Sequence, residues 1–350
     1  MRESRTYIAT PPGETIKEQL EDRGMSQKEF SQRMGMSEKH ISRLINGEVQ
    51  LTPEVAYRLE TVLGVPASFW NNLEAIYREK LVKIEEENAM GEDVQLAKRY
   101  PYKEMAKNEW LPEETVPEKR VAALRSFFEV AQLTFLNNDR LLPRIACRRQ
   151  SVTEKADYAL VAWAQKARLE ARKIATQKVD LKGLEQQLGR IRSMTTEDPE
   201  KFCPELSALL ADHGVALVLL PHIGGSFLHG ATFQEKDKIV MGMTIRGKDS
   251  DKFWFSVFHE IGHILLGHLG QPEGTTLEDE KAADNFAGDI LIPPDDFDRY
   301  TWKGKFSKAS IQQFAAEQGI APGIVVGRLQ KERYIQFNWC NDLKTQYVLQ

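Results

Sequence analysis

Cysteine is scarce in this sequence of 350 residues, which contains only Cys147, Cys203 and Cys340. Their odd number and wide spacing exclude a disulfide framework and a zinc site built on cysteine pairs. No apolar run approaches the roughly 18 residues of a membrane span. Residues 1–14 lack the apolar core of a secretory signal. We therefore expect a cytoplasmic protein with no membrane partner.

An excess of positive charge is also missing. Lys and Arg total 47 and Asp and Glu total 51, which gives a formal net charge of −4. Overall charge therefore draws the chain to neither nucleic acid nor membrane, and a site for either must be local. Hydrophobic residues make up 41% and charged residues 28%, close to the average for folded domains, which excludes a mainly disordered or fibrous chain. At this length we expect two or three domains.

The pattern along the chain predicts four regions and an α+β fold. Short amphipathic helices come first, followed by a strongly charged segment that prolines interrupt, which is typical of a linker with some helix. A region with both helices and strands follows, and the chain ends in helices. The expected boundaries are 1–78, 79–150, 151–300 and 301–350.

The third region holds a small sheet and two helices of interest. Apolar runs bounded by turn residues predict strands at 215–220, 228–233 and 239–243. A long apolar helix is expected at 251–266, and another at 278–291 before a Pro-Pro pair. Helical periodicity also predicts helices at 118–135 and 152–177.

Residues 26–47 have the pattern of two helices joined by a tight turn. Ser26 and Glu29 have the spacing of a capping box that would begin a first helix at 27–34. Gly35 would supply the turn, and Ser37 would cap a second helix at 38–45. The second helix would bury its apolar residues and present a polar face made of Glu38, Lys39, His40, Ser42 and Arg43.

A polar second helix of this kind suits the DNA major groove. Lys39 and Arg43 can reach base edges or phosphates, and Gln27 can donate to a phosphate. The alternative is a small helical bundle with no DNA role, because the segment is not visibly basic.

The stretch 26–70 resembles the Cro/CI-type (XRE) helix-turn-helix, and in particular HigA-type antitoxin repressors. The resemblance covers residues 12–78. It implies a five-helix domain, a homodimer and a palindromic operator in double-stranded DNA. By position it places Gln27 at a phosphate. It places Glu38, Lys39, His40 and Arg43 at the groove. Glu38 stands where phage repressors of this type usually carry Gln, and it could accept a hydrogen bond from a cytosine amine.

The string His259-Glu260-Ile261-Gly262-His263 has metal-ligand spacing. On a helix, residues four apart lie on one face, so both imidazoles can converge on one Zn²⁺. Glu260 can hold a metal-bound water and take its proton, because zinc lowers the pKa of that water to about 7. The surrounding helix is apolar, which makes unpaired polar groups costly there. The alternative is a pair of hydrogen-bonded core histidines.

A catalytic zinc needs a third protein ligand and an open position. The candidates are His268 and the acidic residues 278–280. Glu280 and Asp284 are four apart on the next expected helix, so Glu280 could bind zinc while Asp284 accepts a hydrogen bond from a ligand histidine. The residue that stabilises the oxyanion is left open among His222, His229 and Tyr300, each of which is more simply an ordinary surface residue.

HEIGHILLGH together with EKAADNFAGDILIP resembles the ImmA/IrrE family of zinc metallopeptidases, over residues 150–300. The matching positions are His259, Glu260, His263, Glu280 and 283–287. The resemblance implies a thermolysin-like zincin core with a metal-binding helix and a role in cleaving helix-turn-helix repressors.

Together these motifs predict a transcriptional regulator that is also a zinc-dependent endopeptidase, which cuts its own linker, a partner repressor or a toxin. Glu260 would be its general base. The alternative is a non-enzymatic HigA-like antitoxin or repressor whose C-terminal domain only binds a toxin or a ligand. A purely structural zinc is disfavoured, because two His and one carboxylate leave an open position.

Overall fold

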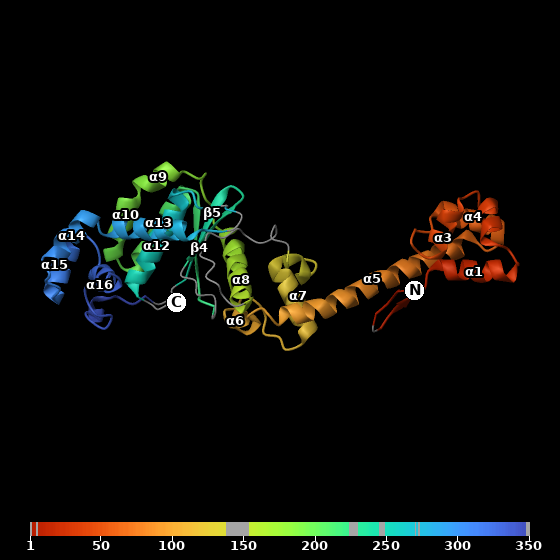
Figure 1. The fold of residues 1–350 in the computed structure, drawn as a ribbon, viewed down its shortest axis with the longest axis horizontal. Coiled ribbons are helices and arrows are strands. Elements are labelled where there is room, and N and C mark those ends of the chain that lie inside the picture. The colour runs from red at the N-terminus through yellow and green to blue at the C-terminus, as the bar shows by residue number, and fades with distance from the viewer. Residues whose placement is uncertain are drawn as a thin grey trace. The chain divides into compact units, whose positions relative to one another are not determined.

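The structure is a computed structural model that describes residues 2–4, 6–137, 154–223, 230–244, 249–269, 271 and 274–347. Cys147, His229 and parts of the expected linker, strand 228–233 and helix 152–177 lie outside these ranges. The chain forms two compact units, Met1–Gln95 and Leu96–Gln350 (Figure 1). No helix in the described residues combines the length and apolar character needed to cross a membrane.

The first unit is a bundle of five helices, preceded by a short antiparallel hairpin of β1 (Arg2–Glu3) and β2 (Ile8–Ala9). The helices are α1 (Pro12–Asp22), α2 (Gln27–Met34), α3 (Glu38–Ile45), α4 (Pro53–Leu63) and α5 (Ala67–Ala97). Each of α2, α3 and α4 begins at a Ser or Thr whose hydroxyl accepts from an amide of the first turn. Their apolar faces enclose one core that includes Phe30 and Trp70, both fully buried. The predicted five helices are confirmed.

Helix α5 extends well beyond the expected boundary at residue 78. Its 31 residues run without a break into the charged segment that the sequence suggested was a linker, and the helix ends at Ala97. Ion pairs at i,i+4 spacing, Glu74–Arg78 and Glu79–Lys83, lie along it at 2.7 and 2.5 Å. Such pairs support an exposed helix by a few tenths of a kcal/mol each, roughly. The high charge density therefore belongs to a solvated helix in this part of the chain.

The second unit is mostly helical, with a small mixed sheet. Strand β5 (Lys238–Thr244) lies between β3 (Val215–Leu220), to which it is parallel, and β4 (Gly230–Glu235), to which it is antiparallel. Three strands were expected, and the expected segments 215–220 and 239–243 are strands. In 228–233, the described residues from 230 onward are also strand.

Helices cover both faces of this sheet (Figure 1). Helix α8 (Glu154–Ala171) packs on one face, where Trp163 lies so close to Gly242 that a Cβ there would be 2.5 Å from the indole. On the other face lies α12 (Ser250–Leu265), whose Trp254 and Phe258 are fully buried. The alternation of side chains along the strands separates these two faces. The remaining helices are α6 (Tyr102–Lys107), α7 (Pro117–Phe128), α9 (Leu181–Gln186), α10 (Leu188–Ser193), α11 (Pro199–Asp212), α13 (Leu277–Leu291), α14 (Pro294–Trp302), α15 (Lys308–Gln318) and α16 (Pro322–Lys331).

The C-terminal helices share the core of the second unit. Buried residues of α15 and α16 join those of α12 and the sheet in one apolar cluster. The chain end is fixed to α12 as well, because Trp254 donates to the hydroxyl of Tyr347 at 3.0 Å and Lys344 pairs with the buried Asp251 at 2.7 Å. Residues beyond 300 therefore help to hold the helix that carries the histidines.

Gly13 tests the packing of α1 against α3. A Cβ at this position would lie 1.8 Å from the carbonyl oxygen of Ile45, and a backbone atom cannot move aside cheaply. We expect Gly13→Ala to destabilise the first unit by about 2 kcal/mol, within the usual range for overpacking. Amides of α1 and α3 should then lose roughly 30-fold in hydrogen-exchange protection, measured by mass spectrometry of the full chain.

Gly91→Ala is the matched control. Gly91 lies within α5 and a Cβ there meets nothing within 4 Å, so this change should stabilise the helix by up to about 1 kcal/mol. Equal protection in the wild type and Gly13→Ala would contradict the close approach of the two helices.

Candidate DNA-binding surface and metal centre

Helices α2 and α3 are joined by a turn in which Gly35 adopts the left-handed conformation, with φ of 63°. Ser26 and Ser37 cap the two helices by accepting from the amides of Glu29 and His40 at 3.1 and 3.2 Å. The carboxylate of Glu29 does not complete the expected capping box. It pairs instead with Arg33, one turn along α2, at 2.6 Å.

The outer face of α3 carries only part of the predicted reading surface. Glu38, Lys39 and Arg43 are exposed, as is Gln27 at the start of α2, whereas Ser42 is half-buried. Ser37 uses its hydroxyl as a helix cap. The apolar residues Ile41, Leu44 and Ile45 are buried, as expected.

His40 differs from the outward orientation expected for it. The residue is half-buried, and its Nε2 is fully buried with no hydrogen-bond partner. That nitrogen cannot reach a base edge in this conformation. Arg43 is nearer to the expectation, since its contact with Glu48, at 3.5 Å, is exposed and an exposed ion pair is weak. Lys39 and Arg43 are therefore the two cations that α3 presents.

The second site lies where α12 and α13 pack together. The side chains of His259, His263 and Glu280 each bring one ligand atom within 4.8 Å of the other two. The two histidine Nε2 atoms are 3.0 Å apart. The Oε2 of Glu280 lies 3.5 Å from the Nε2 of His259, and its Oε1 lies 3.5 Å from the Nε2 of His263. Two histidines from one helix and a carboxylate from the next thus converge on a common point.

This donor set fits zinc. Bonds of 2.0–2.1 Å in a tetrahedral site place ligand atoms about 3.3 Å apart, close to the separations above. The Nδ1 of His259 lies 2.9 Å from the Asp284 carboxylate, which can only accept, so Nδ1 carries a proton and Nε2 is the nitrogen directed at the metal position. Nitrogen lone pairs and carboxylate oxygens that face one another repel unless a cation lies between them. His259, His263 and Glu280 would hold the metal.

The pKa shifts in the cluster show how burial and the neighbouring carboxylates act on the two imidazoles. Burial opposes protonation of His259, but its bonds with Asp284 and Glu280 raise its pKa to about 10. Burial and the charge of His259 lower the pKa of His263 to about 4. Burial raises the pKa of Glu280, but its bonds with His259 and Thr275 outweigh this and lower it overall. The surrounding carboxylates therefore favour a cation beside these imidazoles.

Glu260 is buried against strand β4. Burial is the main cause that raises the pKa of its carboxyl to about 7. Thr232 donates a hydrogen bond to its Oε2 at 2.5 Å. A Cβ at Gly230 would lie only 2.6 Å from its Oε1, so a glycine leaves room for the carboxylate. Sequence reasoning missed both β4 residues, because nothing in the local pattern links them to a helix 30 residues later.

His268, the alternative third ligand, lies on the other side of His263. Its Nδ1 is 3.0 Å from the Nδ1 of His263, and it is not part of the converging set. Of the residues considered for the oxyanion, His229 lies outside the described range. Tyr300 stacks on Phe314 with ring centroids 4.1 Å apart and accepts a hydrogen bond from Ser310.

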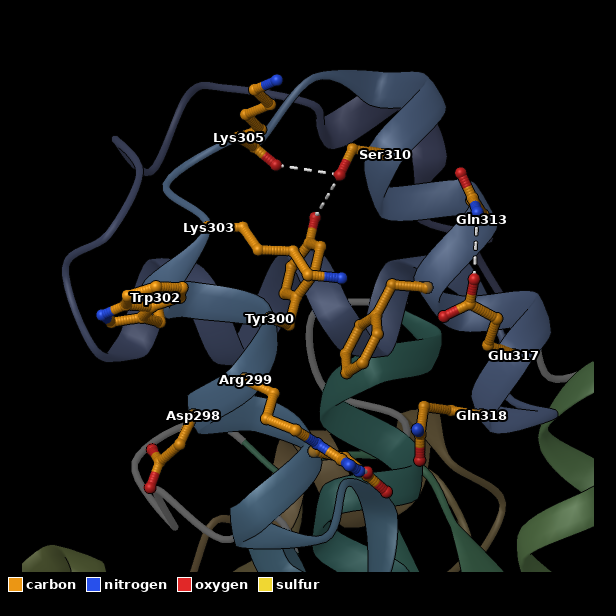
Figure 2. A pocket seen from close by; sticks show the side chains of 12 residues that line it. Asp298, Arg299, Tyr300, Trp302, Lys303, Lys305, Ser310, Gln313, Glu317 and Gln318 are labelled. Carbon is orange, nitrogen blue, oxygen red and sulfur yellow. Dashed lines mark hydrogen bonds and ion pairs between the residues drawn. The ribbon is translucent and has the colours of Figure 1, made fainter.

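Tyr300 lines a surface groove between α14 and α15, with a volume of about 840 Å³. Figure 2 shows its hydroxyl directed at Ser310, while Trp302 projects outward. Trp302 is 90% exposed. None of the three converging metal ligands lines this groove. We therefore find no support for Tyr300 at the metal cluster.

The first unit and its two capped helices define a helix-turn-helix DNA-binding protein, and comparisons with known proteins agree. The helix-turn-helix family matches residues 16–70. The chain is 38% identical over 63 residues to the uncharacterised HTH-type transcriptional regulator YddM of Escherichia coli K12. The aligned residues cover 18% of this chain and 67% of that protein. The chain belongs to the family of helix-turn-helix transcriptional regulators and binds DNA through this domain.

A solved structure from Nostoc punctiforme PCC 73102 is also similar. It is described as a putative antidote protein of a plasmid maintenance system. The identity is 31%, over 23% of this chain and 94% of that one, with a TM-score of 0.21.

Lys39 and Arg43 can be tested on a duplex selected by the wild-type chain from a randomised library. We expect Lys39→Ala and Arg43→Ala each to weaken binding by about 1–3 kcal/mol, or roughly 10- to 100-fold. Lys83→Ala, which removes an equal charge from α5, should leave affinity nearly unchanged. Binding measured by fluorescence anisotropy would contradict this surface if all three variants behaved alike.

Proposed function

We propose that this chain is a DNA-binding regulator whose second unit is a zinc-dependent endopeptidase. The observation that carries the proposal is the convergence of His259, His263 and Glu280, with the buried Glu260 on the same helix turn. Two histidines and one carboxylate leave a coordination position open, as in catalytic zinc sites. A thermolysin-like zincin core and kinship with the ImmA/IrrE family belong to the same proposal.

The residues around the cluster divide the work of peptide hydrolysis. Bound zinc would supply the Lewis acidity that polarises a peptide carbonyl. Glu260 would accept the proton of the attacking water and later pass it to the leaving amine. Thr232 orients the carboxylate of Glu260, and Asp284 orients the ring of His259. The net change is the addition of one water across one peptide C–N bond.

Strand β4 supports a peptide as the substrate. In the described sheet β5 is central and β4 is at the edge, with Gly230 and Thr232 against Glu260. An extended segment could add to this edge through main-chain hydrogen bonds. The candidate substrates are the chain's own region 79–150, a partner repressor or a toxin.

A second candidate is a non-enzymatic repressor of antitoxin type. It is favoured by the family match at residues 16–70, which lies in the first unit. In that case the second unit would bind a toxin or a ligand, and Glu260 would not matter for relief of repression. A homodimer on a palindromic operator in the cytoplasm is proposed for either candidate.

The zinc site is tested by elemental analysis of protein purified without added metal. We expect about one zinc per wild-type chain and a clear loss in Glu280→Ala, because the site loses a ligand. Glu278→Ala removes an exposed acid from the same helix turn and should keep its zinc. A folded wild type that takes up no zinc even when zinc is offered would rule out the enzyme.

Catalysis is tested with Glu260→Gln, which keeps the size of the side chain. The wild type should produce fragments cut between residues 79 and 150, whereas the variant should cut at least about 10²-fold more slowly, because it lacks the base. The zinc content of the variant should equal that of the wild type, which distinguishes loss of the base from loss of the metal site. If both chains remain intact under conditions in which DNA is released, self-cleavage is wrong.

A further inference from the structure

The two ring nitrogens of His263 have different neighbours. Its Nε2 faces the Nε2 of His259 and the carboxylate of Glu280. Its Nδ1 lies 3.0 Å from the Nδ1 of His268. The His263 side chain is only 1% exposed, so bulk water cannot replace a missing partner at either nitrogen. Its Nδ1 therefore depends on His268 as its hydrogen-bond partner.

The end of α12 brings His268 back to His263. The helix ends at Leu265 with Leu266 as its cap, and Gly267 then adopts the left-handed conformation with φ of 77°. The amide of His268 donates to the carbonyl of His263 at 3.0 Å, and the amide of Gly267 donates to the carbonyl of Ile264 at 3.3 Å. These are the two hydrogen bonds of a Schellman motif. The same turn thus pairs the two histidines through both backbone and ring.

The carboxylate of Asp279 lies on the side of His268 that faces away from His263. Its Oδ1 lies 3.4 Å from the Nε2 of His268. Its other oxygen accepts from the amide and the hydroxyl of Thr276, each at 2.9 Å, in the capping box that begins α13. A carboxylate held in this way favours a proton on the nitrogen that faces it. In neutral His268 the proton is then on Nε2, and Nδ1 is an acceptor.

We propose that Asp279 and His268 form a relay that positions His263 and sets the zinc affinity of the cluster. His268 accepts the Nδ1–H of His263, which leaves the Nε2 lone pair of His263 directed at the metal position. His268 is thus a positioning residue and not a metal ligand. This inference rests on the proposed zinc site and gives a role to two residues that the proposed reaction does not use.

The relay differs from the pair that orients His259. The carboxylate that holds His259 belongs to Asp284, whose side chain is 45% exposed, so water can stand in for it. His268 and Asp279 are only 10% and 19% exposed in their side chains, and His263 is almost fully buried. Loss of the acceptor on His268 would leave a buried N–H without a partner, and the ring of His263 would turn or change tautomer.

The experiment measures zinc affinity of the full chain by competition with a chromogenic chelator. His268→Phe keeps a ring but removes the acceptor. We expect this variant to bind zinc about 10- to 100-fold more weakly, as is usual when a hydrogen-bond partner of a metal ligand is lost. His268→Asn places an oxygen where Nδ1 was and should stay close to the wild type. His213→Phe makes the same change at a histidine outside the cluster, whose Nδ1 lies 2.8 Å from the Leu209 carbonyl, and it should have no effect.

A second readout reports the hydrogen bond itself. Long-range ¹H–¹⁵N spectra of histidine-labelled, zinc-loaded protein should show the Nδ1–H of His263 in a hydrogen bond in the wild type and in His268→Asn, but not in His268→Phe. Asp279→Asn keeps the helix cap acceptor and loses the charge, and it should weaken zinc binding less than His268→Phe does. If His268→Phe does not fold, His268→Asn and Asp279→Asn decide the question.

The outcomes separate this inference from the proposed function. A wild type that binds zinc, together with His268→Phe of equal affinity and an unchanged Nδ1–H signal of His263, would overturn the relay and leave the zinc site standing. A wild type that binds no zinc would remove the zinc site, and the relay with it. Weaker binding in His268→Phe with recovery in His268→Asn supports the relay, because a loss of packing alone would not be repaired by a smaller polar side chain.

Discussion

Helix α12 buries a carboxylate and an imidazole, Glu260 and His263, among aromatic side chains of an apolar core. Each of these polar groups costs several kcal/mol, roughly, unless a partner compensates for the lost water. The architecture of the second unit supplies those partners from three directions. Strand β4 provides Thr232, helix α13 provides Glu280, and the turn that ends α12 provides His268. Much of the fold around α12 can be understood as compensation for these two buried groups.

The same constraint explains the contribution of distant segments. A metal site tolerates displacements of only about 0.5 Å, so the elements that carry its ligands must be rigid. Helices α12 and α13 are packed closely enough that Gly262 contacts Phe286 and Ala283. The C-terminal residues Lys344 and Tyr347 hold the other end of α12. The last helices of the chain are thus part of the site's support, although the sequence suggested a separate extension.

The DNA-binding unit follows a simpler logic. Its helices are short, each has a local cap, and one apolar core fixes their packing. The reading surface is weak in charge, since α3 offers two exposed cations beside the exposed acid Glu38. Phosphate attraction supplies much of the affinity of DNA-binding proteins for any sequence. A surface with so few cations depends more on additional contacts, which is consistent with the homodimer proposed above.

The sequence by itself determined the elements and the local spacing. Capping residues and apolar periodicity located α2, α3, α12 and α13 closely, and the i,i+4 rule placed His259 and His263 on one face, because these features depend only on neighbours along the chain. The tertiary structure decided what depends on separate segments meeting. In the structure Glu280, and not His268, converges with His259 and His263, and β4 lies at the sheet edge. His40 is half-buried. Gly230 and Thr232 lie against Glu260. Such contacts join residues many positions apart, and packing alone selects among them.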